Sequence, residues 1–404
     1  MSAEKELQPV APSARLLQLD VLRGLSLFGV LMVNLDVFSG AMWALEAKLP
    51  YPIGWGGATL SFLRQTLLET KAASLLGLLF GVGLAIQLAA TERKGHAYLP
   101  FALRRIGALA LFGLGHSVLL WNFDILLDYA LISLLVLPFM RLRPARILWA
   151  IPLLLGVCAL IALPFLPLLE QAQRQPLWFY QMGLEHYRDG SWLEALQFRT
   201  SEFLQFVGPM RLTSRLPALL PFFILGVYAW KKGFLAEPER HLGTLRVACL
   251  VCLPLGLLFN LLPPSVLHPW VAEIDFRPVR ILIKAIAFFA RPAIILGYVA
   301  GILLLLQRPW WRSQLGRFAP LGRLTLSQYL LQSVVCTWVF NGYGLGLYGE
   351  VSVALCIVGG TLFFSFQVWS SRLWIARYPV GPAEWLWRWM IYPRRAGGGV
   401  RTKA

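Results

Sequence analysis

Long uninterrupted runs of apolar residues are separated by short polar segments along most of the chain. Residues 75–90, LLGLLFGVGLAIQLAA, are typical of these runs. A helical span needs about 20 apolar residues to cross a bilayer, whereas strands of a membrane barrel are short and alternate apolar with polar positions. The pattern therefore predicts an all-α, polytopic membrane helix bundle of about ten transmembrane helices. The expected spans are residues 23–44, 71–91, 101–121, 124–141, 145–169, 215–233, 243–263, 281–306, 320–341 and 351–376.

The amino-acid composition also indicates a membrane protein, and the distribution of charge predicts its orientation in the membrane. The chain is 57% hydrophobic and only 14% charged, against roughly 25% charged residues in a soluble domain. The net charge of +17 comes mainly from Lys and Arg in alternate segments between the spans, as is typical of cytoplasmic loops. We therefore expect both termini to be cytoplasmic. Nucleic acid is not an expected partner, because no basic module with interleaved aromatic residues is present.

One long polar segment divides the chain into two helical halves. A connection as long as residues 170–214 usually has structure of its own, so we expect an extracytoplasmic loop with interfacial helices. The expected organisation is a cytoplasmic N-terminus over 1–22, a first half of about five spans over 23–169, the loop over 170–214, a second half of about five spans over 215–376, and an interfacial, basic cytoplasmic C-terminus over 377–404.

The cysteines do not indicate a metal site or a disulfide framework. Cys158, Cys249, Cys252, Cys336 and Cys356 all lie inside apolar runs, where cysteine behaves as a small apolar residue. Cys249 and Cys252 form a CxxC pair without further ligands nearby in the sequence, so we expect no metal.

Polar residues inside the spans are the candidate functional residues, because an ionisable group in a bilayer is costly. Asp20 and Arg23 are three residues apart at the start of the first span and can form an ion pair. Asn34 follows Arg23 by 11 residues, close to three helical turns or about 16 Å along one face. This stripe is either a topology anchor with a packing amide, or part of a polar pathway.

The third span repeats this spacing with Arg105 and His116. Among the five histidines, His116 is the one placed within an expected span, and a neutral imidazole can act as a general base. The stretch GHSVLLWNFDILLDY, residues 115–129, then turns back and brings Asp124 and Asp128 down the next span, one turn apart. His116 is therefore either a packing histidine or a base with a carboxylate partner.

Further candidates lie in later spans. Lys284 and Arg291 fall near one face of the eighth span, and Arg291 is too far from the interface to snorkel easily. Gln328 and Gln332 are one turn apart and either join helices or line a site. Lys71 stands near the start of the second span. We group these five residues as candidate substrate-binding residues.

Several separated motifs carry a resemblance to a known family. LDVLRGLSLFGVLMVNL, GHSVLLWNFDILLDYALISLLVLPF, GRLTLSQYLLQSVVCTWVFNGYGLGLYG and GPAEWLWRWMIYPRR are similar to the YeiB-like family of bacterial multi-spanning membrane proteins of unknown function. That family resembles a transmembrane acyltransferase superfamily that includes the lysosomal heparan-α-glucosaminide N-acetyltransferase. The shared D-x-x-R-G motif is matched by Asp20, Arg23 and Gly24, and the polar residue ending that helix by Asn34. The catalytic histidine of the lysosomal enzyme lies in the first outer loop. This chain has none there, so His116 would substitute by role.

The resemblance implies a multi-pass enzyme of the bacterial cytoplasmic (inner) membrane. It would move an acyl group, such as acetyl, from cytosolic acetyl-CoA or another acyl-CoA to an extracytoplasmic acceptor, a sugar or glycan. A homodimer is a further expectation, because members of that superfamily are often dimers. Asp20, Arg23, Gly24, Arg104 and Arg105 would then bind the CoA, whose phosphates suit arginine. The expected catalytic residues are His116 as general base, Asp124 or Asp128 as its orienting carboxylate, and Asn34 as the oxyanion donor.

Two other functions remain open. A transporter or flippase for an anionic or sugar-linked substrate would use Arg291, Lys284 and the carboxylates in an alternating-access cavity. A non-catalytic scaffold or sensor would use the same polar residues only to hold its helices together.

Overall fold

A computed structural model describes residues 15–95, 97–261 and 277–392. Over these residues the chain is helical and contains no strand, which confirms the all-α class. The helices are α1 Leu17–Phe38, α2 Ala41–Glu46, α3 Gly57–Leu67, α4 Lys71–Arg93, α5 Tyr98–Leu119, α6 Leu126–Val136, α7 Pro144–Ile147, α8 Ala150–Ala162, α9 Leu166–Gln173, α10 Pro176–Gly183, α11 Trp192–Glu202, α12 Gly208–Met210, α13 Leu216–Lys231, α14 Leu242–Val247, α15 Leu253–Leu261, α17 Arg277–Leu305, α18 Pro309–Gly316, α19 Ala319–Arg323, α20 Thr325–Phe340, α21 Val353–Arg377 and α22 Pro382–Ile391.

Seven helices among the described residues are long and apolar enough to cross a membrane, or eight if one bent pair counts as a single span. The prediction of about ten spans is therefore not confirmed. Two expected spans are short in the structure. Residues 124–141 form only a short apolar helix, Leu126–Phe139, and residues 320–341 are broken at Leu324, between α19 and the 16-residue α20. The bent pair is Arg291–Leu305 with Pro309–Gly316, at 115°.

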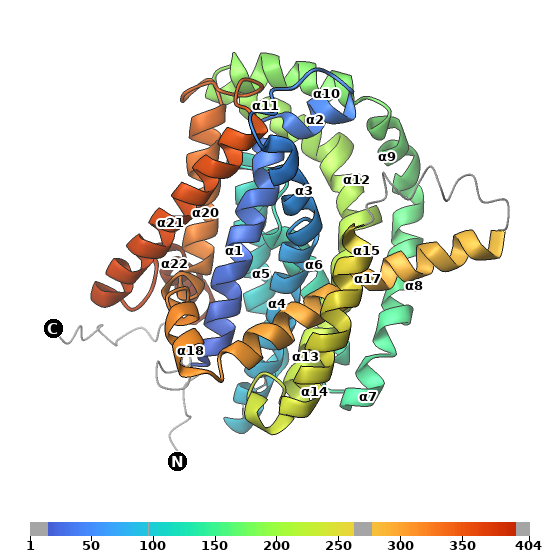
Figure 1. Ribbon diagram of the computed structural model, residues 1–404, viewed down its shortest axis with the longest axis vertical. Helices are drawn as coiled ribbons and strands as arrows, with labels where there is room; N and C mark the ends of the chain where they lie inside the picture. The colour runs from blue at the N-terminus through green and yellow to red at the C-terminus, as the bar shows by residue number, and fades with distance from the viewer. Residues whose placement is uncertain (1–14, 96, 262–276, 393–404) are drawn as a thin grey trace.

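The helices form an upright bundle with short helices across its two ends (Figure 1). α1 packs against α4, α19, α20 and α21, and α13 packs along α4. In the orientation of Figure 1, α2, α10 and α11 lie across the upper end, while α7, α14 and α18 lie at the lower end. α22 packs against α5 and α20.

Glycines allow the closest helix contacts. A Cβ at Gly81 of α4 would lie 2.0 Å from the carbonyl oxygen of Phe223, and a Cβ at Gly226 of α13 would lie 2.0 Å from that of Leu78. In membranes, small residues of this kind let backbones approach where burial of apolar surface gives no driving force. Gly24 has the same role in α1, because its Cβ would lie 2.4 Å from the Phe318 carbonyl oxygen.

The segment 170–214 is helical throughout much of its length rather than a loop with a few interfacial helices. α10 and α11 do cover the upper end (Figure 1). However, Trp192–Lys231 forms one helical segment of 40 residues. The π-helical turns Phe203–Val207 and Arg211–Arg215 are part of this segment. This segment enters the bundle, where Arg211 is only 3% exposed.

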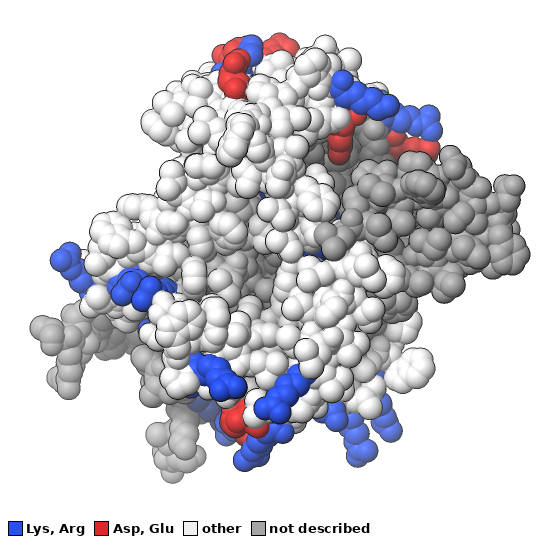
Figure 2. All heavy atoms as spheres, in the orientation of Figure 1, with Lys and Arg blue, Asp and Glu red and all other residues white. Residues whose placement is uncertain are grey.

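Charge differs between the two ends of the bundle. Figure 2 shows Lys and Arg gathered at the lower end, whereas the upper end carries both acidic and basic side chains. By the positive-inside rule, we expect the lower end to face the cytoplasm. The outermost parts of both expected cytoplasmic termini, residues 1–14 and 393–404, lie outside the described residues.

Candidate functional site

A hydrogen-bonded chain of side chains joins three helical segments in the upper half of the bundle. His116 Nδ1 on α5 lies 2.8 Å from Asp124 Oδ1, which precedes α6. The other ring nitrogen, Nε2, lies 2.8 Å from the hydroxyl oxygen of Ser333 on α20. All three side chains are buried. We call them the His116 triad; the sequence had suggested the histidine and the carboxylate but not the serine.

The partners of Asp124 determine the direction of the hydrogen bonds. Besides His116, its carboxylate accepts from the Leu127 backbone N–H at 2.7 Å and from the Tyr329 hydroxyl at 3.3 Å. A carboxylate surrounded by donors acts as an acceptor, so the imidazole carries its proton on Nδ1. Nε2 is then the free lone pair, and it accepts a hydrogen bond from the Ser333 hydroxyl. This is the arrangement of a general base with an orienting group and a hydroxyl in reach.

Asp128 does not reach His116 and has a different role. It forms ion pairs with Arg211 and with Arg215, the latter at 2.7 Å. The same two arginines donate to the carbonyl oxygen of Asp124, at 3.0 and 3.1 Å. Of the two carboxylates considered for His116, Asp124 is the one in contact with it, and Asp128 anchors the arginines that hold the backbone of Asp124.

Arg211 and Arg215 were not among the residues singled out from the sequence. Their spacing in the sequence could have indicated them, because two arginines four residues apart match two aspartates four residues apart on a facing helix. The signal was hidden since both arginines precede the apolar run that begins at Leu216.

A second buried cluster lies between α5 and α11. Glu202 accepts from Asn122 Nδ2 at 2.5 Å and from the Tyr187 hydroxyl at 2.8 Å. Arg199 donates to the carbonyl oxygen of Leu119 at 2.8 Å, at the C-terminal end of α5. This cluster was also missed, because Tyr187, Arg199 and Glu202 lie within the segment that was expected to be a loop.

The lower half of the bundle contains a pair of arginines, of which Arg105 is buried and Arg23 is partly exposed. A Cβ built on Gly83 of α4 would lie 3.8 Å from Nη2 of both Arg23 and Arg105, so the two guanidinium groups face the same space. Asp20 lies 3.6 Å from Arg23, which confirms the expected ion pair, and 3.4 Å from Arg323. We call Arg23 and Arg105 the lower arginine pair.

Arg105 is short of acceptors. Its Nη1 is buried without a hydrogen-bond partner among the described residues, and so is Nε1 of Trp387. The Arg105 guanidinium lies 4.8 Å from the centroid of the Trp387 ring. Burial and the charge of Arg15 lower the pKa of Arg388 on the same helix, α22. Two unpartnered donors in a region of positive charge are suited to an anion.

Two other residues from the expected CoA set stand outside this pair. Arg104 is exposed and is not brought together with Arg23. Gly24 lies against the Phe318 carbonyl, so its small size is explained by the packing of α1 on α19.

The candidate amide side chains Gln328, Gln332 and Asn34 differ in their hydrogen bonding. Gln332 donates to Gln367 at 3.0 Å, Gln367 donates to the Gln328 side chain at 2.8 Å, and Gln328 donates to Ser371 at 3.0 Å. This ladder joins α20 to α21, as amides between membrane helices can. Asn34, in contrast, forms no hydrogen bond with any described residue and is partly exposed.

Lys71 and Arg291 belong to a charged group around the start of α4. Lys71 Nζ donates to the Gln65 carbonyl at 2.9 Å. Arg291 interacts electrostatically with Glu69, but it forms no ion pair with a described residue. Thr70, between Glu69 and Lys71 in the sequence, has φ +64°, a left-handed conformation that is unusual for a β-branched residue. Lys284 lies in α17, outside the residues whose side chains are described.

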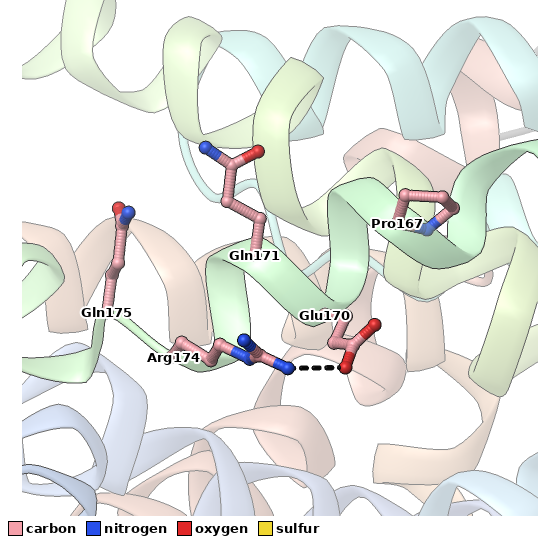
Figure 3. A pocket seen from close by; sticks show the side chains of 5 residues that line it. All are labelled: Pro167, Glu170, Gln171, Arg174 and Gln175. Atoms are coloured by element: carbon pink, nitrogen blue, oxygen red, sulfur yellow. Dashed lines mark hydrogen bonds and ion pairs between the residues drawn. The ribbon is translucent and has the colours of Figure 1, made fainter.

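Two surface hollows lie apart from these groups. One hollow, of about 260 Å³, lies at the C-terminal end of α9. Glu170 and Arg174, which form an ion pair at 2.7 Å, are among its lining residues (Figure 3). A second hollow, of about 430 Å³, lies between α5 and the end of α6. Its lining residues are Tyr98, Leu99, Leu103, Leu134, Leu137, Pro138, Met140 and Arg141. Neither hollow contains a member of the His116 triad or of the lower arginine pair.

Comparison with known proteins places the chain in a family. Residues 229–394 match the family described as "Protein of unknown function (DUF418)". The uncharacterized protein YxaH of Bacillus subtilis (strain 168) is 31% identical over 407 residues, which cover 96% of each chain. The uncharacterized protein YeiB of Escherichia coli (strain K12) is 26% identical over 411 residues, covering 95% of this chain and 98% of the relative.

A third relative, described as "Uncharacterized 39.9 kDa protein in amylase 3′region" of Bacillus acidopullulyticus, is 27% identical over 394 residues, covering 96% of this chain and 97% of the relative. No solved structure matches the chain. Because the similarity to YxaH and YeiB extends over nearly the whole length, the chain belongs to the YeiB-like family of membrane proteins.

Proposed function

We propose that the protein is a membrane-embedded acyltransferase that moves an acyl group, such as acetyl, from cytosolic acyl-CoA to an extracytoplasmic acceptor, a sugar or glycan. One observation carries the proposal: His116 is held between the Asp124 carboxylate and the Ser333 hydroxyl at 2.8 Å on each side. A buried histidine so oriented has one lone pair available for a proton.

The chemistry needs a base, an orienting group and a place for the negative charge of the thioester oxygen. His116 Nε2 takes the proton from the attacking hydroxyl or amine, and Asp124 stabilises the imidazolium that forms. Arg211 and Arg215 keep Asp124 in place through its carbonyl oxygen. Asn34, whose amide has no partner among the described residues, is the proposed donor to the oxyanion.

The lower arginine pair supports the choice of an acyl-CoA as donor. CoA carries several phosphates, Arg23 and Arg105 face a common space, and Nη1 of Arg105 is buried without an acceptor among the described residues. Arg105 and His116 are on the same helix, 11 residues apart, which is about 16 Å along the axis. The pantetheine arm of CoA is long and thin, so it can extend from the arginines towards the histidine.

The acceptor is proposed to arrive from the upper end. Lys71 and Arg291 lie near Glu69 at the start of α4, in the half of the bundle that we expect to face away from the cytoplasm. Two cations beside a single carboxylate leave an excess of positive charge, which suits an acceptor that bears negative charge or polar sugar hydroxyls.

The same charged group favours a second candidate function, a transporter or flippase for an anionic or sugar-linked substrate. Asp36 and Arg64 form a buried ion pair beside it, so this end of the bundle holds several charges that the membrane does not require. A transporter would move such a substrate without acyl-CoA.

The first test is acetyl-CoA binding to the purified protein, measured by calorimetry. We expect saturable binding to the wild type and a loss of at least tenfold in affinity for Arg23→Ala and Arg105→Ala, about 1.4 kcal/mol or more. Arg93→Ala is the matched control, because Arg93 is an exposed arginine near the lower end of α4. A well-folded wild type that does not bind acetyl-CoA would contradict the acyltransferase, and flux of anions into liposomes without acyl-CoA would favour the transporter.

A further inference from the structure

The hydroxyl of Ser333 differs from most other hydroxyls in the bundle. In apolar helices a serine or threonine commonly donates to the carbonyl four residues earlier in its own helix. Eight described side chains do so, namely Ser26, Ser74, Thr91, Ser133, Thr200, Thr213, Thr361 and Ser365. Ser333 does not. Its one hydrogen bond to a described residue is with Nε2 of His116, 217 residues away in the sequence.

We propose that Ser333 is the nucleophile of the reaction and carries the acyl group as a covalent ester between donor and acceptor. This inference rests on the acyltransferase proposal and adds a reaction intermediate to it. The geometry meets the requirements for an activated serine, since the nucleophile is within hydrogen-bond reach of a base and a third group orients that base.

The first half of the reaction acylates the serine. Ser333 Oγ attacks the carbonyl carbon of the thioester while His116 Nε2 takes the hydroxyl proton. The tetrahedral intermediate collapses, the carbon–sulfur bond breaks, and His116 returns the proton to the sulfur, so that free CoA leaves as the thiol. The products are an acyl ester on Ser333 and a neutral imidazole, with no other reactant needed.

The second half regenerates the enzyme. A hydroxyl or amine of the acceptor attacks the ester carbonyl while His116 takes its proton. The bond between the acyl carbon and Ser333 Oγ breaks, and the serine recovers the proton from His116. Both halves use the same base in alternate directions, as in other reactions with a covalent intermediate.

The buried position of Ser333 suits a covalent acyl intermediate. α20 begins at Thr325 and packs at its start against α19 and α22. Ser333 is eight residues further along, about 12 Å, and only 1% exposed. Donor and acceptor approach from opposite sides of the membrane, and a covalent intermediate allows them to bind in turn rather than together. A buried ester is also shielded from hydrolysis by water.

The experiment is acyl trapping without acceptor. Purified full-length protein is incubated with radiolabelled acetyl-CoA, and three quantities are measured: free CoA released, label bound to protein, and the labelled peptide by mass spectrometry. We expect up to one acetyl group per chain, on the peptide containing Ser333, with an equal amount of CoA released. The label should be absent in Ser333→Ala and in His116→Ala.

The controls separate chemistry from folding. Ser133→Ala removes a hydroxyl that is equally buried, at 1% exposure, but bonded within its own helix, and should label like the wild type. Ser333→Cys retains a nucleophile and should give a thioester, recognised by rapid release with neutral hydroxylamine. Each variant is first tested for saturable acetyl-CoA binding, which shows that it is folded.

The outcomes distinguish this inference from the function on which it depends. If the wild type binds acetyl-CoA but acquires no label and releases no CoA, Ser333 is not the nucleophile, and direct transfer with His116 as base remains. Label on His116 or on another residue also overturns the role of Ser333. If acetyl-CoA does not bind a folded wild type, the acyltransferase proposal fails and the covalent intermediate fails with it.

Discussion

The guanidinium group of Arg105 on α5 lies 4.8 Å from the centroid of the Trp387 ring on α22. This contact connects the amphipathic C-terminal helix to the lower arginine pair. Nη1 of Arg105 and Nε1 of Trp387 are both buried without an acceptor. The helix expected from the sequence to lie at the membrane interface therefore also forms one wall of the proposed CoA site.

Replacing Trp387 with alanine should weaken acetyl-CoA binding without unfolding the protein. The indole N–H of Trp387 has no acceptor among the described residues and is a proposed donor to a CoA phosphate. A hydrogen bond to a charged group contributes about 1.5–3 kcal/mol, so we expect the dissociation constant to rise by roughly 10- to 150-fold. Calorimetry on the purified variant measures it. Trp389→Ala is the control, because Trp389 is on the same helix but 53% exposed, and its affinity should not change. An unchanged affinity in Trp387→Ala would show that α22 is not part of the site.

Removing the charge of Asp128 should destabilise the protein strongly. Asp128→Asn leaves Arg211, which is 3% exposed, and Arg215 without their carboxylate partner. Breaking a buried ion pair on one side costs about 3–5 kcal/mol. We expect a clear fall in the thermal unfolding midpoint in detergent and lower yield.

The control for Asp128 is the exposed pair shown in Figure 3. Glu170 and Arg174 are 66% and 75% exposed, and exposed pairs contribute little, so Glu170→Gln should unfold at the wild-type temperature. If Asp128→Asn did so too, the ion pairs with Arg211 and Arg215 would not hold this part of the bundle together.

The sequence predicted those parts of the candidate site that are local in the chain. Asp20 with Arg23, and His116 with Asp124, are 3 and 8 residues apart, and helical spacing or a tight turn between helices is enough to bring them together. The fold class could also be predicted from the sequence, because the length of an apolar run corresponds to the thickness of the bilayer that a helix must cross.

What the sequence did not predict depends on contacts between distant segments. Ser333 and His116 are 217 residues apart in the sequence. A single serine in an apolar helix forms no sequence pattern from which its partner could be predicted. The burial of Arg211 within the bundle could not be predicted for another reason. Polar residues within Trp192–Lys231 suggested a loop, but Arg211 and Arg215 there both pair with Asp128, and a paired charge does not interrupt a span as an isolated charge does.

Glu384 should matter for stability rather than for binding. Its carboxylate accepts from the backbone N–H groups of Leu326 and Ser327, at 2.8 and 3.1 Å, in the first turn of α20. An acidic group at a helix N-terminus satisfies donors that the helix leaves free and interacts well with the helix dipole. We expect Glu384→Ala to lower the free energy of unfolding by about 1–3 kcal/mol.

Thermal unfolding in detergent tests this role of Glu384. Glu239→Ala is the control, because Glu239 is an exposed glutamate in a short turn before α14. Acetyl-CoA affinity of folded Glu384→Ala should stay within about twofold of the wild type. A variant as stable as the wild type would show that the contact between α22 and α20 does not depend on this carboxylate.

Alanine should have opposite effects at two glycines of the helix bundle. Alanine favours a helix over glycine by about 1 kcal/mol, so a glycine that faces open space should gain stability when replaced. Gly107 of α5 has no atom within 4 Å of its Cβ position, whereas the Cβ of Gly226 would lie 2.0 Å from the Leu78 carbonyl oxygen. Gly226→Ala must push α13 away from α4, which costs about 1–3 kcal/mol or more. We expect the unfolding midpoint to fall for Gly226→Ala and to stay level or rise for Gly107→Ala; a rise for both would mean that α4 and α13 are not in close contact at Gly226.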